Sequence, residues 1–85
     1  MANSLTYRQR AKIHQKEANA FDALAKLKMK EGNDANPLLT NASVAADYLA
    51  VIQIYEQANA YDFQATNHQS QADANNAQAD ATGEP

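Results

Sequence analysis

A six-residue stretch, GNDANP at residues 32–37, limits the folds open to this sequence more than any other feature. Glycine, asparagine and proline clustered in this way predict a turn. The segments on either side, about residues 5–31 and 38–71, contain neither glycine nor proline. The first is rich in alanine, lysine, glutamine and leucine, which favour helices. The sequence therefore predicts two helices joined by one turn.

The first helix has capping residues at both ends. Ser4 or Thr6 can supply the N-cap oxygen, and Gly32 stands where a left-handed C-cap residue belongs. Lysines near its end suit the negative pole of the helix dipole. Apolar residues recur along it at spacings of three and four, which predicts a narrow apolar stripe in its second half. The stripe consists of Ile13, Ala20, Phe21, Leu24 and Leu27.

The second helix is expected to begin at Leu38, because Asn36 and Pro37 offer an N-cap and a first helical residue, while Thr40 or Asn41 offers a later start. Its large apolar residues cover more than one face, so a single partner helix cannot bury them all. We therefore predict that they form an interface with another protein. The predicted interface residues are Val44, Tyr48, Leu49, Val51, Ile52, Ile54, Tyr55, Tyr61 and Phe63.

Alanine dominates the later part of the second helix. Ala58, Ala65 and Ala72 recur at heptad intervals, and small side chains there allow close helix approach. After Gln71 the chain has no large apolar residue, so burial cannot offset the entropy of ordering it. We therefore expect a frayed or disordered polar tail. The predicted domains are a helical hairpin at 1–72, with helices at about 5–31 and 38–71 around a turn at 32–37, and a flexible tail at 73–85.

Charge is divided unevenly between the two predicted helices. All seven lysines and arginines lie in residues 1–30, whereas residues 31–85 carry eight acidic residues and no basic one. A short turn between helices of similar length favours an antiparallel αα-hairpin, so the predicted fold class is all-α. The basic helix then lies beside the acidic one. Each exposed ion pair between them contributes only about 0–1 kcal/mol.

Four basic residues near the start of the chain form the best candidate surface for a charged partner. They are Arg8, Arg10, Lys12 and Lys16. With Tyr7 beside them, they could contact the phosphates of a nucleic acid. The net charge of the whole chain is −3, however, and nucleic-acid binders usually carry a basic excess. We favour a solvated helix face that pairs with acidic residues of the second helix or of a neighbouring subunit.

The sequence offers little for catalysis, cofactor binding or metal binding. It contains no cysteine, no glycine-rich phosphate loop and no nucleophile beside a base. His14 and His68 are far apart, and neither Asp62 nor Asp73 stands four residues from His68 to complete a metal site on one helix face. The tyrosines of the second helix could line a pocket with Phe63, but such a stripe is more often core or interface. We predict a non-enzymatic protein without cofactor or metal.

The hydropathy pattern predicts where in the cell the protein is found. No run of about 18 apolar residues is present, so we expect no membrane insertion. The basic N-terminal segment is not followed by the apolar core and cleavage site of a signal peptide. We expect cytoplasmic synthesis without a cleaved signal, followed by incorporation into a virion or an exported filament.

These features favour a structural subunit that packs through its second helix, because a contiguous exposed apolar patch marks a protein–protein contact. We expect a homo-oligomer or a larger virion-like or filamentous assembly, with a phage structural component as the favoured setting. The competing hypothesis is a small dimeric nucleic-acid-binding or regulatory module that presents the basic segment.

One segment also resembles a known family. The stretch ANPLL at residues 35–39, followed by Tyr48, Ile52 and Tyr55, is similar to the turn and second helix of type III secretion needle subunits. This resemblance implies a helical hairpin that polymerises into a filament. The polar C-terminal segment departs from the ordered, apolar-containing end that those subunits use for packing.

Overall fold

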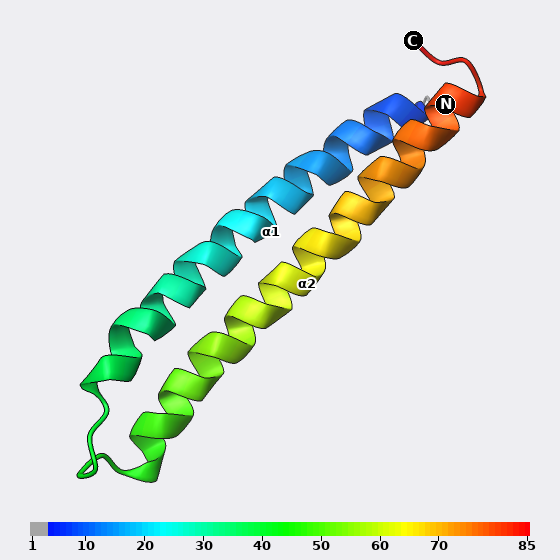
Figure 1. Cartoon of the computed structure of the whole chain (residues 1–85). Helices are drawn as coiled ribbons and strands as arrows, with labels where there is room; N and C mark the ends of the chain where they lie inside the picture. The colour runs from blue at the N-terminus through cyan, green and yellow to red at the C-terminus, as the bar shows by residue number, and fades with distance from the viewer. Residues whose placement is uncertain (1–3) are drawn as a thin grey trace.

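The chain folds into two long antiparallel helices that lie side by side (Figure 1). The computed structural model describes residues 4–85, so the first three residues of the predicted hairpin domain lie outside it. Helix α1 spans Tyr7–Ala35, a short 3₁₀ turn η1 spans Asn36–Leu38, and helix α2 spans Ala45–Ala81. The molecule measures 62 × 26 × 14 Å. The predicted all-α hairpin is confirmed, and it is a single layer of helices.

The predicted N-cap of α1 is correct, whereas its predicted C-cap is wrong. The side chain of Thr6 accepts a hydrogen bond from the backbone amide of Gln9, and the side chain of Gln9 accepts one from the amide of Thr6. This reciprocal arrangement is a capping box. At the other end, Gly32 does not adopt the left-handed conformation, because α1 continues for another turn to Ala35. A Cβ atom on Gly32 would lie 2.8 Å from the ring of Tyr55, so this glycine serves close helix approach instead.

Helix α2 begins later than the sequence predicted. Pro37 lies in η1 rather than at the start of α2, and residues 39–44 form a loop. Asp47, in the first turn, accepts a hydrogen bond from the backbone amide of Val44 at 3.2 Å. The hydroxyl of Tyr48 donates to the carbonyl of Thr40 at 3.0 Å. These two bonds tie the loop to the first turn of α2.

The predicted flexible tail is wrong for most of its length, because α2 continues without interruption to Ala81. Ala72 and Ala79 are fully buried there against α1. Polar contacts replace the missing large apolar groups: the Arg8 guanidinium donates to Asn76 at 2.9 Å and to Asp80 at 2.7 Å. Composition alone underestimated the helical order of this segment, because it does not take into account the packing of the segment against α1.

The buried interior is a line of very small residues that repeats every seven positions on both helices. We call these residues the alanine seam: Ala11, Ala18, Ala25 and Gly32 on α1, and Val51, Ala58, Ala65, Ala72 and Ala79 on α2. A strict seven-residue repeat is the signature of a left-handed supercoil, in which the same stripe always faces the partner helix. Small side chains at these positions let the two backbones approach closely.

The predicted apolar stripe of α1 therefore faces the wrong way. Ile13, Leu24 and Leu27 are 45%, 40% and 65% exposed, and only Phe21 of the large members is partly covered by α2. The prediction failed because it assumed that the largest apolar residues lie inside. A two-helix seam accepts only small residues when the axes are this close.

Much of the molecule's surface remains open to solvent. The accessible surface is 6097 Å², against about 5,000 Å² expected for a compact monomer of this mass. The excess follows from the single-layer shape, in which only the seam is covered from both sides. Among residues 4–85, neither helix combines the length and apolar character needed to cross a membrane.

Candidate interaction surface

The structure divides the nine predicted interface residues, eight in α2 and Val44 just before it, into two groups. Val51 is buried in the alanine seam, and Ile54, Tyr55 and Tyr61 are half-buried against α1. The remaining five are exposed: Val44, Tyr48, Leu49, Ile52 and Phe63. The hairpin itself thus covers four of the predicted residues, and five stay available to a partner.

Three of the five exposed residues, Leu49, Ile52 and Phe63, lie on one side of α2, with Glu56 between Leu49 and Phe63. Leu49 and Phe63 are two heptads apart and so lie in the same column, while Ile52 follows Leu49 by one helical turn. Their exposed fractions are 56%, 66% and 48%. This side, which we call the α2 edge, faces away from the seam.

Helix α1 carries a second, smaller apolar strip. Leu24 and Leu27 are one turn apart, and neither belongs to the columns that contact α2. We call this strip the α1 edge. Because each edge points away from the seam, the two lie on opposite margins of the hairpin. A single partner helix laid along one margin leaves the other uncovered.

The two edges also differ in charge. Helix α1 carries every lysine and arginine of the chain, whereas α2 carries acidic residues and neither lysine nor arginine. Most ion pairs of α1 are internal to that helix, as between Lys26 and Asp22 at 3.0 Å. Among the described residues, one ion pair of a lysine or arginine joins the two helices, and it is formed by Arg8 and Asp80. Within residues 4–85, Glu56 and Asp62 of α2 have no such partner.

One lysine on α1 has a raised pKa. The hydrogen bond and charge of Asp34 raise the pKa of the Lys30 side chain above its usual value of 10.5. The ammonium lies 2.7 Å from the carboxylate, and both groups are exposed. A lysine is charged at physiological pH even at its usual pKa, so this exposed pair has little effect on stability there.

The basic segment proposed as a charged-partner surface is partly occupied. Arg8 contacts the C-terminal part of α2 through Asp80, and the Arg10 guanidinium lies 5.4 Å from the centre of the Tyr7 ring. Lys12 and Lys16 are exposed and form no ion pair with any residue in the described part of the chain. Two of the four predicted residues are thus engaged within the hairpin.

Sequence reasoning missed the role of Glu84. Its carboxylate accepts hydrogen bonds from the backbone amides of Tyr7 and Arg8, both at 3.2 Å. These amides lie in the first turn of α1, where the helix leaves donors unpaired and the dipole favours a negative charge. Glu84 therefore caps α1 from the far end of the chain. Only the antiparallel register, which the sequence does not state, brings the two together.

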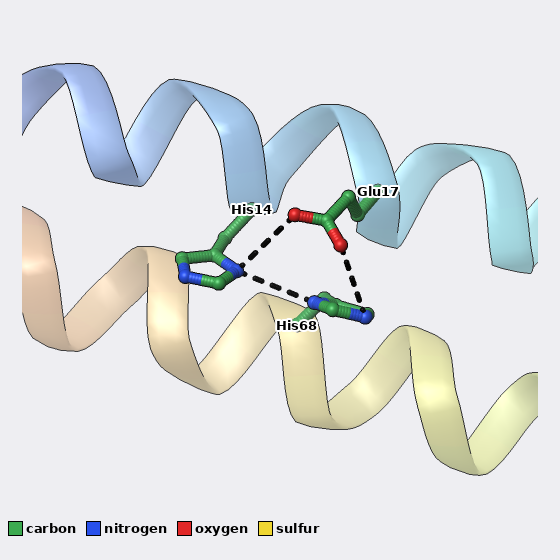
Figure 2. A group of neighbouring side chains, drawn as sticks. All are labelled: His14, Glu17 and His68. Carbon is green, nitrogen blue, oxygen red and sulfur yellow. Dashed lines mark hydrogen bonds and ion pairs between the residues drawn. The ribbon is translucent and has the colours of Figure 1, made fainter.

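Sequence reasoning also missed a cluster of three side chains in the half of the hairpin nearer the termini. Figure 2 shows the carboxylate of Glu17 above the imidazole rings of His14 and His68. The Nδ1 atoms of the two histidines are 3.3 Å apart, and Glu17 lies 3.5 Å from His14 and 3.4 Å from His68. Glu17 and His14 come from adjacent turns of α1, whereas His68 comes from α2. The acidic partners considered for His68 in the sequence, Asp62 and Asp73, do not belong to the cluster.

Two shallow hollows lie along one side of the hairpin. Asp22 and Asp62 border both of them, and the other lining residues are mainly polar or alanine. None of the tyrosines proposed to line a ligand pocket borders either hollow. Tyr61 instead stacks on Phe21, with 6.1 Å between ring centres, as a contact between the helices.

The chain was compared with protein-family models, with curated proteins and with solved structures. None of the three comparisons gives a match.

Proposed function

We propose that this protein is a structural subunit that associates with copies of itself, the α1 edge of one hairpin packing against the α2 edge of the next. The observation that carries the proposal is that small residues fill the interior while large apolar residues lie on the surface. The buried residues are alanine, glycine and one valine, while Leu27, Leu49 and Phe63 are more than half exposed. Exposed apolar residues that gather into patches mark association surfaces.

Charge supports a second copy as the occupant. A contact between two α2 edges would bring acidic helices together, because α2 has no lysine or arginine. A contact between α1 and α2 edges places the basic helix against the acidic one. Such complementarity favours the correct partner and suppresses the wrong one.

The predicted contact is heterologous, since each copy presents two different surfaces. Contacts of this kind close into a ring or continue into an open filament. A side-by-side array would also supply the burial that a single-layer hairpin lacks. A phage virion component is the setting that we favour, and an exported needle-like filament is the alternative.

The proposal is tested by the particle size of the purified protein and of two matched variants. Ile52→Asp places a charge on the α2 edge, whereas Asn59→Asp places the same charge one heptad further along the same column. We expect ordered particles in negative-stain micrographs, and a mass by light scattering well above that of one chain. Ile52→Asp should reduce the mass to that of one hairpin, and Asn59→Asp should reduce it far less.

Circular dichroism of both variants checks that the hairpin is still formed. Val51→Asp is unsuitable as a test, because Val51 lies in the alanine seam and its loss would unfold the subunit itself. A wild-type protein that remains a monomer at the highest attainable concentration would contradict the proposal.

A further inference from the structure

We infer that His14, Glu17 and His68 bind a divalent transition-metal ion of the zinc class. The cluster joins two imidazoles and a carboxylate, which is a common ligand set for such ions. One ligand atom from each residue can be chosen so that all lie within 4.8 Å of one another. This inference does not depend on the self-association proposed above.

The distances suit a tetrahedral ion. Ligand atoms about 2.0–2.1 Å from zinc at tetrahedral angles are separated by about 3.3 Å. The Nδ1 atoms of His14 and His68 are 3.3 Å apart, and His14 Nδ1 lies 3.5 Å from a Glu17 oxygen. His68 faces His14 through Nδ1 and Glu17 through Nε2, so binding requires a side-chain rotation that points one of these nitrogens at the ion. The His68 ring also presents Nε2 to the second Glu17 oxygen at 3.4 Å.

The ligands come from a rigid frame. His14 and Glu17 stand three residues apart on α1, a spacing that helical metal sites use to place a carboxylate and an imidazole on one face. The ring of His68 stacks on Phe21 with an angle of 3° between the planes and 5.4 Å between the centres. The His14 ring also stacks on the His68 ring, with 5.5 Å between the centres. His68 is therefore held in place before a metal arrives.

The site is also accessible. The side chains of His14 and His68 are 26% and 21% exposed, and that of Glu17 is 40% exposed. An ion can enter from solvent, and water can complete its coordination. Because the ligands belong to both helices, the bound ion would link α1 to α2 near the middle of the polar half of the hairpin.

The test is titration of the full-length chain, made without a histidine tag, with zinc chloride. We expect one zinc ion per chain by isothermal titration calorimetry. The chain has only two histidines, so proton NMR should show both imidazoles shifting together as zinc is added. EDTA should reverse the shifts.

Three variants identify the ligands. His68→Ala, His14→Ala and Glu17→Gln should each weaken zinc binding by more than about tenfold, because even partners outside the first coordination sphere commonly contribute 10–100-fold. Gln15→Ala and Gln69→Ala are matched controls. These glutamines neighbour the histidines on the same helices and bond to each other at 2.8 Å, but they lie outside the cluster. They should leave zinc affinity unchanged.

Circular dichroism checks that each variant is folded. If a histidine variant unfolds, Glu17→Gln decides the question, because it keeps the size of the side chain and removes only the charge. Zinc binding that persists in His68→Ala or in Glu17→Gln would overturn the inference. So would the absence of imidazole shifts in the wild-type chain at millimolar zinc.

Discussion

The two halves of the hairpin share one buried seam but differ in what lies beside it. In the half nearer the turn, Phe21, Ile54, Tyr55 and Tyr61 flank the seam. The exposed Leu27, Leu49, Ile52 and Phe63 lie on the edges that face away from it. In the half nearer the termini, the flanking residues are polar: Arg8, His14, Gln15, His68, Gln69, Asn75 and Asn76. The same backbone architecture thus supports an apolar half and a polar half.

The difference shows what each class of interaction contributes. The polar half is joined by directional contacts, such as the paired amides of Gln15 and Gln69 and the link from Arg8 to Asp80. Such contacts fix the register of the two helices but add only about 1 kcal/mol each. The apolar half carries the surface available for association. Under the two proposals above, the polar half would fix the register and bind the metal, and the apolar half would carry the association surface.

The largest effect is expected from enlarging a seam residue. Ala58→Leu inserts a branched side chain where 1% of the residue is exposed, so the helices must separate. We expect a loss of about 3 kcal/mol in the free energy of unfolding, at the upper end for overpacked cores. Chemical denaturation, monitored by circular dichroism, measures this loss.

Ala60→Leu is the control, because Ala60 is exposed on the same helix and the change should cost little. Ala72→Leu extends the comparison to the polar half, where we expect a smaller loss because the ends can splay apart. Equal losses at 58 and 72 would show that the two halves do not differ in this way.

A smaller effect is expected at Gly32. An alanine there gains up to about 1 kcal/mol of helix propensity, but its Cβ would lie 2.8 Å from the Tyr55 ring, which is held by a hydrogen bond to Asn33. We expect Gly32→Ala to be destabilising in the wild type and stabilising in a Tyr55→Val background. Thermal unfolding of the single and double variants decides this. A stabilising Gly32→Ala in the wild type would refute the close approach at this position.

In the polar half, Glu84→Gln should lower stability by about 0.5 kcal/mol, because it removes a charge from the N-terminus of α1. Hydrogen exchange should speed up at the amides of Tyr7 and Arg8 and stay unchanged near the turn. Asp73→Asn is a suitable control, since Asp73 contacts only Gln69 of its own helix in the described structure. Unchanged exchange at Tyr7 would show that Glu84 does not act as a cap.

The smallest effect concerns pH in the apolar half. The pKa of Lys30 is raised by Asp34, so its contribution to stability is complete below the usual value of 10.5 and is lost as pH rises through the folded value. The pair is fully exposed, and the difference between the wild type and Lys30→Gln should be slight at neutral pH. The melting temperatures of the wild type and of Lys30→Gln should converge as the pH is raised through the alkaline range. A difference that grows with pH would contradict this assignment.

Part of this structure could be predicted from the sequence. The GNDANP turn, the helical composition and Thr6 were sufficient to predict an antiparallel hairpin and the start of α1, because turn and capping preferences are local. The orientation of α1 was not predicted, since large residues such as Leu24 and Leu27 were assumed to lie inside. The missed signal was the alanine repeat at residues 11, 18 and 25, which matches the heptad spacing already noticed on α2.

The candidate sites depended on information that is not local. His14 and His68 are 54 residues apart, and only the register of the two helices brings them together. The same register places Glu84 at the start of α1 and keeps the polar segment after Gln71 helical. A residue pattern within one helix cannot predict this register.

Cysteine cross-linking tests the central claim, edge-to-edge association, most directly. The chain has no cysteine, so Leu27→Cys and Phe63→Cys each introduce a single thiol, one on each edge. When the two variants are mixed under mild oxidation, we predict that the dimer joining one chain of each kind forms faster than either homodimer. Preferential Phe63→Cys homodimers, or no cross-linking at any concentration, would contradict the account.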